Sequence, residues 1–367
     1  MPLSKIQDIG NQVIPKLGRR NLIINGDMRI AQRGTSNSGV TNNGSHFLVD
    51  RFKTVVNSSY TNTVQQVEDV PDGEGFKYSL KQTFTTAKSS PSSGDYNVLD
   101  QNLEKQNIYS TENGTSSAKS ITLSFFVKSS VTGTFAVALQ NYGSSRRSNV
   151  LSYTISSVNT WEKKVITTTA DPSANTNSDN GAGLGLRFAL SAGSSYEASN
   201  ATTGWQTADY FGFNGATYPA GTTNATWQIT GVQLEVGDTA TDFEHRPYSE
   251  ELRLCMRYYE KSYNYGVVPG SAGTSAAVNY QGAIFFTTAH NNHHQEIQYK
   301  ERKRAAPTLT LYNTHTGATG QNYSHHDNNS TAQSDTWANG ENGARVSFAG
   351  TGDGERTEFH YTAEAEL

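Results

Sequence analysis

The chain has 367 residues, of which 34% are hydrophobic and only 17% are charged, and its formal net charge is −4. This length favours two domains rather than one. The composition excludes a disordered chain, and the slightly acidic balance argues against a nucleic-acid-binding protein, which would need a basic face. The chain has a single cysteine, Cys255, so no disulfide can form within it.

Residues 1–20 place Leu3, Ile6, Ile9 and Val13 at the spacing of a short amphipathic helix. Such a helix has nothing of its own to bury, so we expect the segment to dock on another protein as an anchor. It lacks the continuous apolar run of a signal peptide, and no segment of the chain is apolar over the length of a membrane span, so we expect no membrane insertion.

From Asn21 onward the pattern predicts short strands separated by polar turns. An apolar run with an Asn-Gly turn signal comes first, at 21–34. Strand-like alternation then appears at 46–56, 76–84, 120–143, 159–170, 183–191 and 227–236. The stretch 120–143 predicts a hairpin, with Ile121, Leu123, Phe125 and Val127 on one face of its first strand and Phe135, Val137 and Leu139 on one face of its second. Many short strands joined by long polar loops predict a two-sheet sandwich.

A helix is predicted next, over 248–265. Ser249 is a good N-cap, and two glutamates follow it in the first turn. The apolar residues Leu252, Cys255, Met256 and Tyr259 share one helical face, which Leu254 and Tyr258 flank. Strand texture returns over 266–367, with very polar loops at 313–343, and predicts a second, smaller β domain. The basic segment 299–304 (YKERKR) is interpreted as a solvated strand end.

No arrangement typical of an enzyme emerges, because the acidic residues are dispersed rather than paired. Asp50 is the most sequestered acid, and we interpret it as part of an ion pair or a turn clamp. The histidines at 290–294 and 324–327 lack the HExxH spacing of metalloproteases. We interpret them as surface or ligand-facing side chains; a metal shared across a symmetry axis, or a loose structural calcium at 175–181, is the alternative. We expect no cofactor and no resident metal.

Aromatic side chains set among Asn, Ser, Gly and His are typical of sugar contacts, because rings stack on sugar faces while amides and hydroxyls bond to sugar hydroxyls. Plain turn chemistry is the alternative for any one of them. The candidate glycan-binding residues are Tyr263, Tyr265, Tyr323, His325, His326 and Trp337.

Five motifs occur in order: NLIINGDMRIAQRG (21–34), VDRF (49–52), LDQNLEKQNI (99–108), ITLSFFVKSSVTGTFAVAL (121–139) and VQLEVGDTATDFEHRPYSEELRLCMRYYEKS (232–262). Together they resemble bacteriophage tail-fibre and tail-associated proteins with a carbohydrate-binding-module-like jelly roll. The resemblance runs from about Asn21 to Tyr312. It implies a homotrimeric protein of the virion surface that presents glycan-contacting loops to the host.

We therefore predict an all-β protein with an anchor (1–20), a jelly-roll β-sandwich (21–247), a linking helix (248–265) and a C-terminal β domain (266–367). Copies of the helix are expected to meet around a threefold axis through Leu252, Leu254, Tyr258 and Tyr259. Residues 1–20 would bind other tail or capsid proteins. The expected function is non-catalytic attachment to host glycans. The alternatives are a structural head fibre or vertex decoration, and a glycan-cleaving enzyme.

Overall fold

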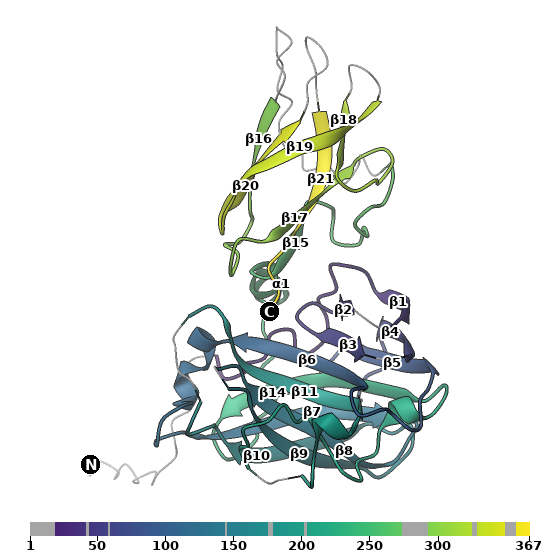
Figure 1. Ribbon diagram of the computed structural model, residues 1–367, viewed down its shortest axis with the longest axis vertical. Coiled ribbons are helices and arrows are strands. Elements are labelled where there is room, and N and C mark those ends of the chain that lie inside the picture. Colours follow the sequence, from purple (N-terminus) through teal and green to yellow (C-terminus); the bar gives the residue numbers. More distant parts are fainter. Residues whose placement is uncertain are drawn as a thin grey trace, which may run out of the picture.

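The computed structural model describes residues 19–41, 44–57, 59–143, 145–174, 179–201, 204–273, 293–324, 329–348 and 357–367; the side chains at 44–45, 293–294, 324, 329–337, 348 and 357 are not described. The predicted anchor at 1–20 therefore lies outside the described residues, apart from its last two. The described strands form two six-stranded sheets, a short two-stranded sheet, and a seven-stranded sheet that stands beyond the first two, which confirms the all-β class (Figure 1).

The first two sheets are antiparallel throughout. Sheet A has the order β1 (Ser36–Val40), β4 (Thr61–Val67), β5 (Ser79–Thr86), β14 (Thr226–Val236), β7 (Ser120–Ser129) and β10 (Glu162–Thr169). Sheet B has the order β2 (Gly44–Phe47), β3 (Lys53–Asn57), β6 (Tyr96–Glu104), β11 (Ala182–Ala192), β8 (Gly133–Asn141) and β9 (Arg147–Ile155).

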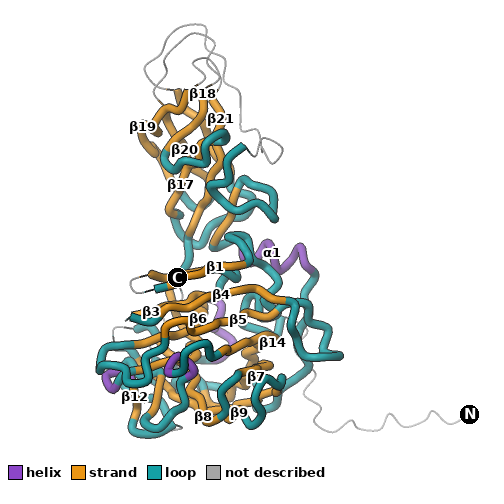
Figure 2. The backbone as a smooth tube through the Cα atoms, turned by 90° about the vertical axis from the view of Figure 1, so that its right-hand side faces the viewer, coloured by secondary structure: helices purple, strands orange, loops and turns teal. Residues whose placement is uncertain are grey.

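The remaining elements are short, except in the seven-stranded sheet. Beside the sandwich lie η1 (Lys105–Thr111), η2 (Ser194–Tyr196), β12 (Glu197–Ala198), β13 (Gly212–Phe213) and η3 (Pro219–Gly221). The helix α1 (Tyr248–Met256) then leads to sheet C, whose order is β15 (Tyr259–Lys261), β21 (Thr357–Glu364), β18 (Gln321–Ser324), β19 (Asn329–Asn339), β20 (Gly343–Phe348) and β16 (His293–Gln298), with β17 (Thr308–Asn313) also paired to β21. Figure 2, turned by 90°, again shows α1 between the sandwich and sheet C.

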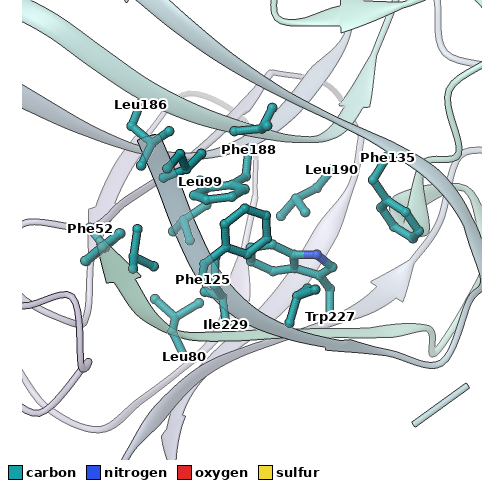
Figure 3. Packing of buried hydrophobic residues seen from close by; sticks show 14 of the residues in the cluster. Phe52, Leu80, Leu99, Phe125, Phe135, Leu186, Phe188, Leu190, Trp227 and Ile229 are labelled. Atoms are coloured by element: carbon teal, nitrogen blue, oxygen red, sulfur yellow. The ribbon is translucent and has the colours of Figure 1, made fainter. Parts of the chain in front are cut away.

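One core fills the space between sheets A and B (Figure 3). Phe125 of sheet A and Phe188 of sheet B meet edge to face with ring centroids 5.1 Å apart, and Phe188 contacts Trp227 at 5.6 Å. The indole N–H of Trp227 donates to the buried hydroxyl of Tyr153 at 3.2 Å. Because both sheets contribute interdigitating rings, the domain is the two-sheet sandwich that the alternating strands predicted.

The predicted hairpin at 120–143 is wrong, because its two strands do not pair with each other, but the residues predicted to share one face of each strand do so. β7 pairs with β10 and β14 in sheet A, whereas β8 pairs with β9 and β11 in sheet B. The chain crosses from one sheet to the other at 130–132, so the apolar faces of both strands point into the same core. Alternation reports which residues face a core, and says nothing about whether successive strands pair or cross.

Two other segments differ from the predicted pattern. Residues 21–34 contain the predicted turn, with Asn25 at a φ of 61°, but no strand. β18 and β19 run through the predicted polar loops at 313–343, because a strand paired on both sides is held by its backbone hydrogen bonds whatever its polarity. The helix also ends earlier than predicted, at Met256, since the residues from Tyr259 join sheet C as β15.

The segment 299–304 is not a solvated strand end. Lys303 is fully buried, and its ammonium donates to Glu260 at 2.6 Å and to the backbone oxygens of Glu301 and Met256. The guanidinium of Arg304 donates to the backbone oxygen of Ala365 at 2.9 Å. Lys303 and Arg304 thus hold the segment against α1 and the end of sheet C, while Lys300 and Arg302 of the same segment stay exposed.

Candidate binding site

The motifs at 21–34, 49–52, 99–108 and 232–262 converge where the sandwich meets α1 and sheet C. We call this region the joint, and it comprises residues 21–33, 49–52, 101–104, 244–260 and 364–366. Asn25 lies at its centre: its backbone N–H donates to Glu251 of α1 at 2.6 Å, and its side-chain amide donates to the backbone oxygens of Ile30 and Asp50 at 2.9 Å. These motif residues therefore build internal contacts rather than an open surface.

Asp50 and Arg51 are adjacent in the sequence but bind different partners within the joint. The buried Asp50 carboxylate accepts hydrogen bonds from the backbone and side chain of Gln32, at 3.0 and 2.6 Å, and lies 3.5 Å from the Arg33 guanidinium. Burial raises the pKa of Asp50 to about 6, although Arg33 opposes the rise. Arg51 pairs with Glu366 instead. The geometry fits the interpretation of Asp50 as a structural clamp, with Arg33 rather than Arg51 as its cation.

Glu104, at the end of β6, holds the residues that follow α1. The Arg257 guanidinium donates to both of its carboxylate oxygens, at 2.7 and 2.8 Å, and the Tyr258 hydroxyl donates to one of them at 2.5 Å. The Arg51 guanidinium lies 3.5 Å from the centre of the Tyr258 ring. Sheet B and sheet C are thus connected through a buried carboxylate and a buried ring.

This packing corrects part of the predicted trimer contact. Tyr258 and Tyr259 are buried within the chain, so neither offers a surface to another copy. Leu252 and Leu254 are half-buried and pack beside the cluster formed by Ile24, Ile30, Cys255 and Tyr258. The helix thus packs against the turn at 21–30 of its own chain. The homotrimer itself stays a prediction.

A second group of polar side chains lies on the outward face of sheet B. We call it the polar cluster, and it comprises Lys53, Asp100, Asn102, Gln140, Tyr142 and Arg187. Asp100 of β6 lies between Lys53 of β3 and Arg187 of β11 in the strand register. Gly185 lies between Asn102 and Gln140 in the next outward row. Alternation along antiparallel strands brings all these side chains to one face.

Contacts within the polar cluster orient its charged groups. Arg187 donates to Asp100 at 3.0 Å and to the Tyr142 hydroxyl at 3.4 Å, and Arg146 stacks on the Tyr142 ring at 4.7 Å. At the edge of the cluster, Asp209 accepts hydrogen bonds from Arg146 at 2.8 Å and from Gln140 at 2.9 Å. Burial raises the pKa of Tyr142, so its hydroxyl stays protonated over the physiological range.

Four buried atoms of the polar cluster have no hydrogen-bond partner among the described residues: Asp100 Oδ1, Asn102 Oδ1, Gln140 Oε1 and Arg187 Nε. Three of them accept hydrogen bonds and one donates. Leaving a buried polar atom unpaired costs about 1–3 kcal/mol. Asp100 Oδ1 also lies 3.8 Å from the Lys53 ammonium, so the other three atoms are the ones that most need a partner. A hydroxyl group can both donate and accept, so hydroxyls of a ligand or of water would satisfy the set.

Gly185 makes room for this arrangement. A Cβ atom at this position would lie 2.8 Å from both Asn102 Oδ1 and the Tyr142 ring. The glycine therefore lets the Tyr142 ring lie down against the sheet, half-buried beside the unpaired acceptors. A half-exposed ring next to amide and carboxylate oxygens is the combination that stacks on a sugar and bonds to its hydroxyls.

The sequence predicted a different set of binding residues. Tyr263 is 3% exposed and stacks on His360 with ring centroids 3.9 Å apart, and Tyr323 is 8% exposed and stacks on His315 at 3.6 Å. Neither ring offers a face to a sugar, so both predictions are corrected. Tyr265 keeps a 39% exposed ring and accepts a hydrogen bond from the Ala31 backbone at 2.7 Å. His325, His326 and the side chain of Trp337 lie outside the described residues.

The polar cluster itself was missed, because its residues belong to strands rather than loops, except Tyr142, which directly follows β8. The available signal was Asp100-x-Asn102 and Gln140-x-Tyr142, two pairs of polar residues at alternate positions next to strongly apolar neighbours. Such spacing indicates one polar face on an otherwise buried strand.

Within the described part of the chain, no three His, Cys, Asp or Glu side chains come together as a metal site. The side chains of the histidines at 290–294, together with 325–327, lie outside that part. No helix among the described residues has the length and apolar character needed to cross a membrane.

The buried His360 predicts a measurable pH dependence. Burial lowers its pKa from the ordinary 6.5 to about 4, so between these values the unfolded chain binds a proton that the folded chain does not. Stability is therefore lost as the pH falls through this window. His360→Gln should reduce that loss by up to about 3 kcal/mol, measured by urea unfolding from pH 7 to 4.5. Asp50 has the opposite effect, because its raised pKa means that stability is lost as the pH rises through about 6. This contribution is the same in the wild type and in His360→Gln, so it cancels in the comparison. Parallel curves for the two proteins would contradict the prediction.

Comparisons with known proteins are weak. No protein-family model and no curated protein matches the sequence. Among solved structures, a bacteriophage CBA120 tailspike protein 4 enzymatically active domain is similar over 59% of this chain, with 14% identity and a TM-score of 0.31; the match spans only 21% of that domain. A putative sugar-binding protein from Bacteroides thetaiotaomicron has 11% identity and a TM-score of 0.33, covering 59% of this chain and all of its own. A CBM22-1 xylan-binding domain from Paenibacillus barcinonensis has 9% identity and a TM-score of 0.29, covering 61% and 99%. No functional conclusion follows from likenesses this weak.

Proposed function

We propose that this protein is a non-catalytic component of a bacteriophage particle surface that attaches the particle to glycans of the host. The observation that carries the binding proposal is the half-buried Tyr142 ring beside four unpaired buried polar atoms. The assignment to a phage particle rests on the ordered motifs of the sequence, most of which build the joint. The location on the virion surface belongs to the same proposal.

The chemistry of the polar cluster favours a ligand rich in hydroxyl groups. Its unpaired atoms are three acceptors and one donor, and a sugar hydroxyl can donate to the first kind and accept from the second. Asp100 and Asn102 lie two residues apart on the same strand face, and both are buried. A sugar would reach them by displacing the Leu367 carbonyl, which accepts hydrogen bonds from Lys53 and Asn102 at 3.2 Å. A purely apolar ligand would leave all four atoms unpaired and would bind poorly.

We propose binding without cleavage. Glycosidases need two carboxylic groups facing the bond, one of them protonated to act as the acid. The two carboxylates of this region, Asp100 and Asp209, are both paired with arginines, at 3.0 Å to Arg187 and 2.8 Å to Arg146. That environment is typical of a binding or structural carboxylate rather than of a general acid.

A purely structural role in the particle, as a head fibre or vertex decoration, is the second candidate. The joint favours it, because the motif residues form a buried network that fixes α1 and sheet C on the sandwich. Binding of the purified protein to bare capsids, without binding to host cells, would support this candidate over the first.

Tyr142→Ala tests the proposal. The variant should weaken binding to the recognised glycan at least about tenfold, because it removes the ring on which the sugar stacks. Tyr142→Phe keeps the ring and should retain most of the affinity. Binding would be measured on an array of bacterial surface glycans and then by calorimetry with the glycan found.

Tyr109→Ala is the matched control, since Tyr109 is an exposed tyrosine on η1, outside the polar cluster. It should leave both binding and the melting temperature unchanged. A wild-type protein that binds no glycan on the array, or equal losses in the two alanine variants, would contradict the proposed site.

A further inference from the structure

A groove of about 500 Å³ lies beside α1, at the edge of the joint. Its charged lining consists of Arg19, Arg253, Arg257 and Arg302 with Glu250 and Glu301. Each of the four arginines pairs with a glutamate: Arg19 with Glu250 and Arg253 with Glu301 in the lining, and Arg257 with Glu104 and Arg302 with Glu341 just outside it. A groove of this volume is within the usual range for small-ligand sites.

Three arginines of the groove have N–H donors that no described residue accepts. Arg253 uses Nε and Nη2 on Glu301, Arg257 uses the same two atoms on Glu104, and Arg302 uses them on Glu341. No described residue accepts from Nη1 of any of these three. A guanidinium carries five N–H donors, so each of the three retains donors that its carboxylate partner does not occupy.

Two of these ion pairs are also easily exchanged. The side chains of Arg253 and Arg302 are 71% and 69% exposed, so their pairs with Glu301 and Glu341 are surface pairs that water weakens strongly. A ligand carboxylate could therefore compete for either guanidinium at little cost. Arg257 differs, because its partner Glu104 is buried, and it stays in place as a fixed donor.

We infer that the groove binds an acidic sugar unit, whose carboxylate is held by the arginines beside α1. A guanidinium fork matches a carboxylate with two parallel hydrogen bonds, and Leu254 supplies an apolar surface for a sugar ring. That the anion belongs to a glycan rests on the proposed function. The polar cluster is rich in acceptors and the groove is rich in donors, so the two sites select different sugar units.

The test is calorimetry with three probes: tetragalacturonate, its fully methyl-esterified form and inorganic phosphate. Tetragalacturonate should bind the wild-type protein, and the neutral ester should bind at least about tenfold more weakly. The double variant Arg253→Gln/Arg302→Gln should lose tetragalacturonate binding by about the same factor. Lys163→Gln/Arg345→Gln removes two exposed charges elsewhere on the molecule and is the matched control, with affinity expected to stay close to that of the wild type.

Three results would overturn the inference. The first is no binding of tetragalacturonate to the wild-type protein. The second is an equal loss of affinity in both double variants, which would indicate a bulk charge effect. The third is phosphate binding as tight as that of the tetramer, which would indicate a general anion site. Tyr142→Ala separates this inference from the proposed function. If Tyr142→Ala abolishes binding of the array glycan but not of tetragalacturonate, the polar cluster and the groove are independent sites. Evidence against one of them then does not contradict the other.

Discussion

Lys303→Met is expected to lower the free energy of unfolding by about 3–5 kcal/mol, because it leaves a buried carboxylate without its cation. Lys303 and Glu260 are both fully buried, with 2.6 Å between the ammonium and the carboxylate. Burial lowers the pKa of Lys303, while Glu260 opposes the shift. Glu260 also accepts hydrogen bonds from the Tyr361 hydroxyl at 2.8 Å and from the Lys300 backbone at 3.0 Å, so it cannot turn toward solvent without breaking them.

Urea unfolding of the variant measures the effect, and Arg302→Gln is the control. Arg302 is a cation one position away whose pair with Glu341 lies on the surface, so its replacement should cost less than about 1 kcal/mol. The double variant Lys303→Met/Glu260→Gln should recover part of the loss, since no unpaired charge then remains buried. If Lys303→Met lowers the free energy of unfolding no more than Arg302→Gln does, the Lys303–Glu260 pair does not stabilise the end of sheet C.

The strands of the sandwich could be predicted because one face of each packs into the core between the sheets, and that packing imposes an alternating pattern of apolar residues on the sequence. The inward residues Phe125 and Phe135 were identified in this way. Their pairing could not be predicted, because the three residues between β7 and β8 allow either a hairpin or a crossing to the other sheet. β18 and β19 were missed for another reason: backbone ladders form them without an apolar pattern.

The binding residues were harder to predict than the fold. Tyr263 and Tyr323 have the composition of sugar contacts, but each lies stacked on a histidine: Tyr263 on His360, far along the chain, and Tyr323 on the nearby His315. Conversely, Asp100 and Arg187 have no distinguishing feature in the sequence, and only the strand register shows that they lie side by side. Motif resemblance pointed to Glu104 and Arg257 without revealing that they bond to each other across the joint. Contacts over such separations depend on topology, which residue types alone do not determine.

Glu104→Ala is expected to lower the free energy of unfolding by on the order of 3 kcal/mol and to loosen the joint locally. Burial acts to raise the pKa of Glu104, but hydrogen bonds from Arg257 and Tyr258 outweigh it, and the net pKa lies below the ordinary value. The carboxylate is thus ionised and fully bonded in the folded chain. Its removal leaves the buried Tyr258 hydroxyl without an acceptor and the Arg257 guanidinium without its anion.

Hydrogen exchange distinguishes this effect from a general loss of stability. Ala365 donates its backbone N–H to the Tyr258 carbonyl at 2.7 Å, so amides at 258–261 and 365 should exchange faster in Glu104→Ala, while those of β7 keep their relative protection. Glu112→Ala is the control, since that glutamate pairs with Lys119 on the surface. The double variant Glu104→Ala/Arg257→Ala should lose less free energy of unfolding than the two single variants together, by about 1 kcal/mol or more. The reason is that Arg257→Ala removes a charge that Glu104→Ala has already left unpaired. Additive costs, or faster exchange spread evenly over the sandwich, would mean that Glu104 stabilises sheet B alone and does not connect it to sheet C.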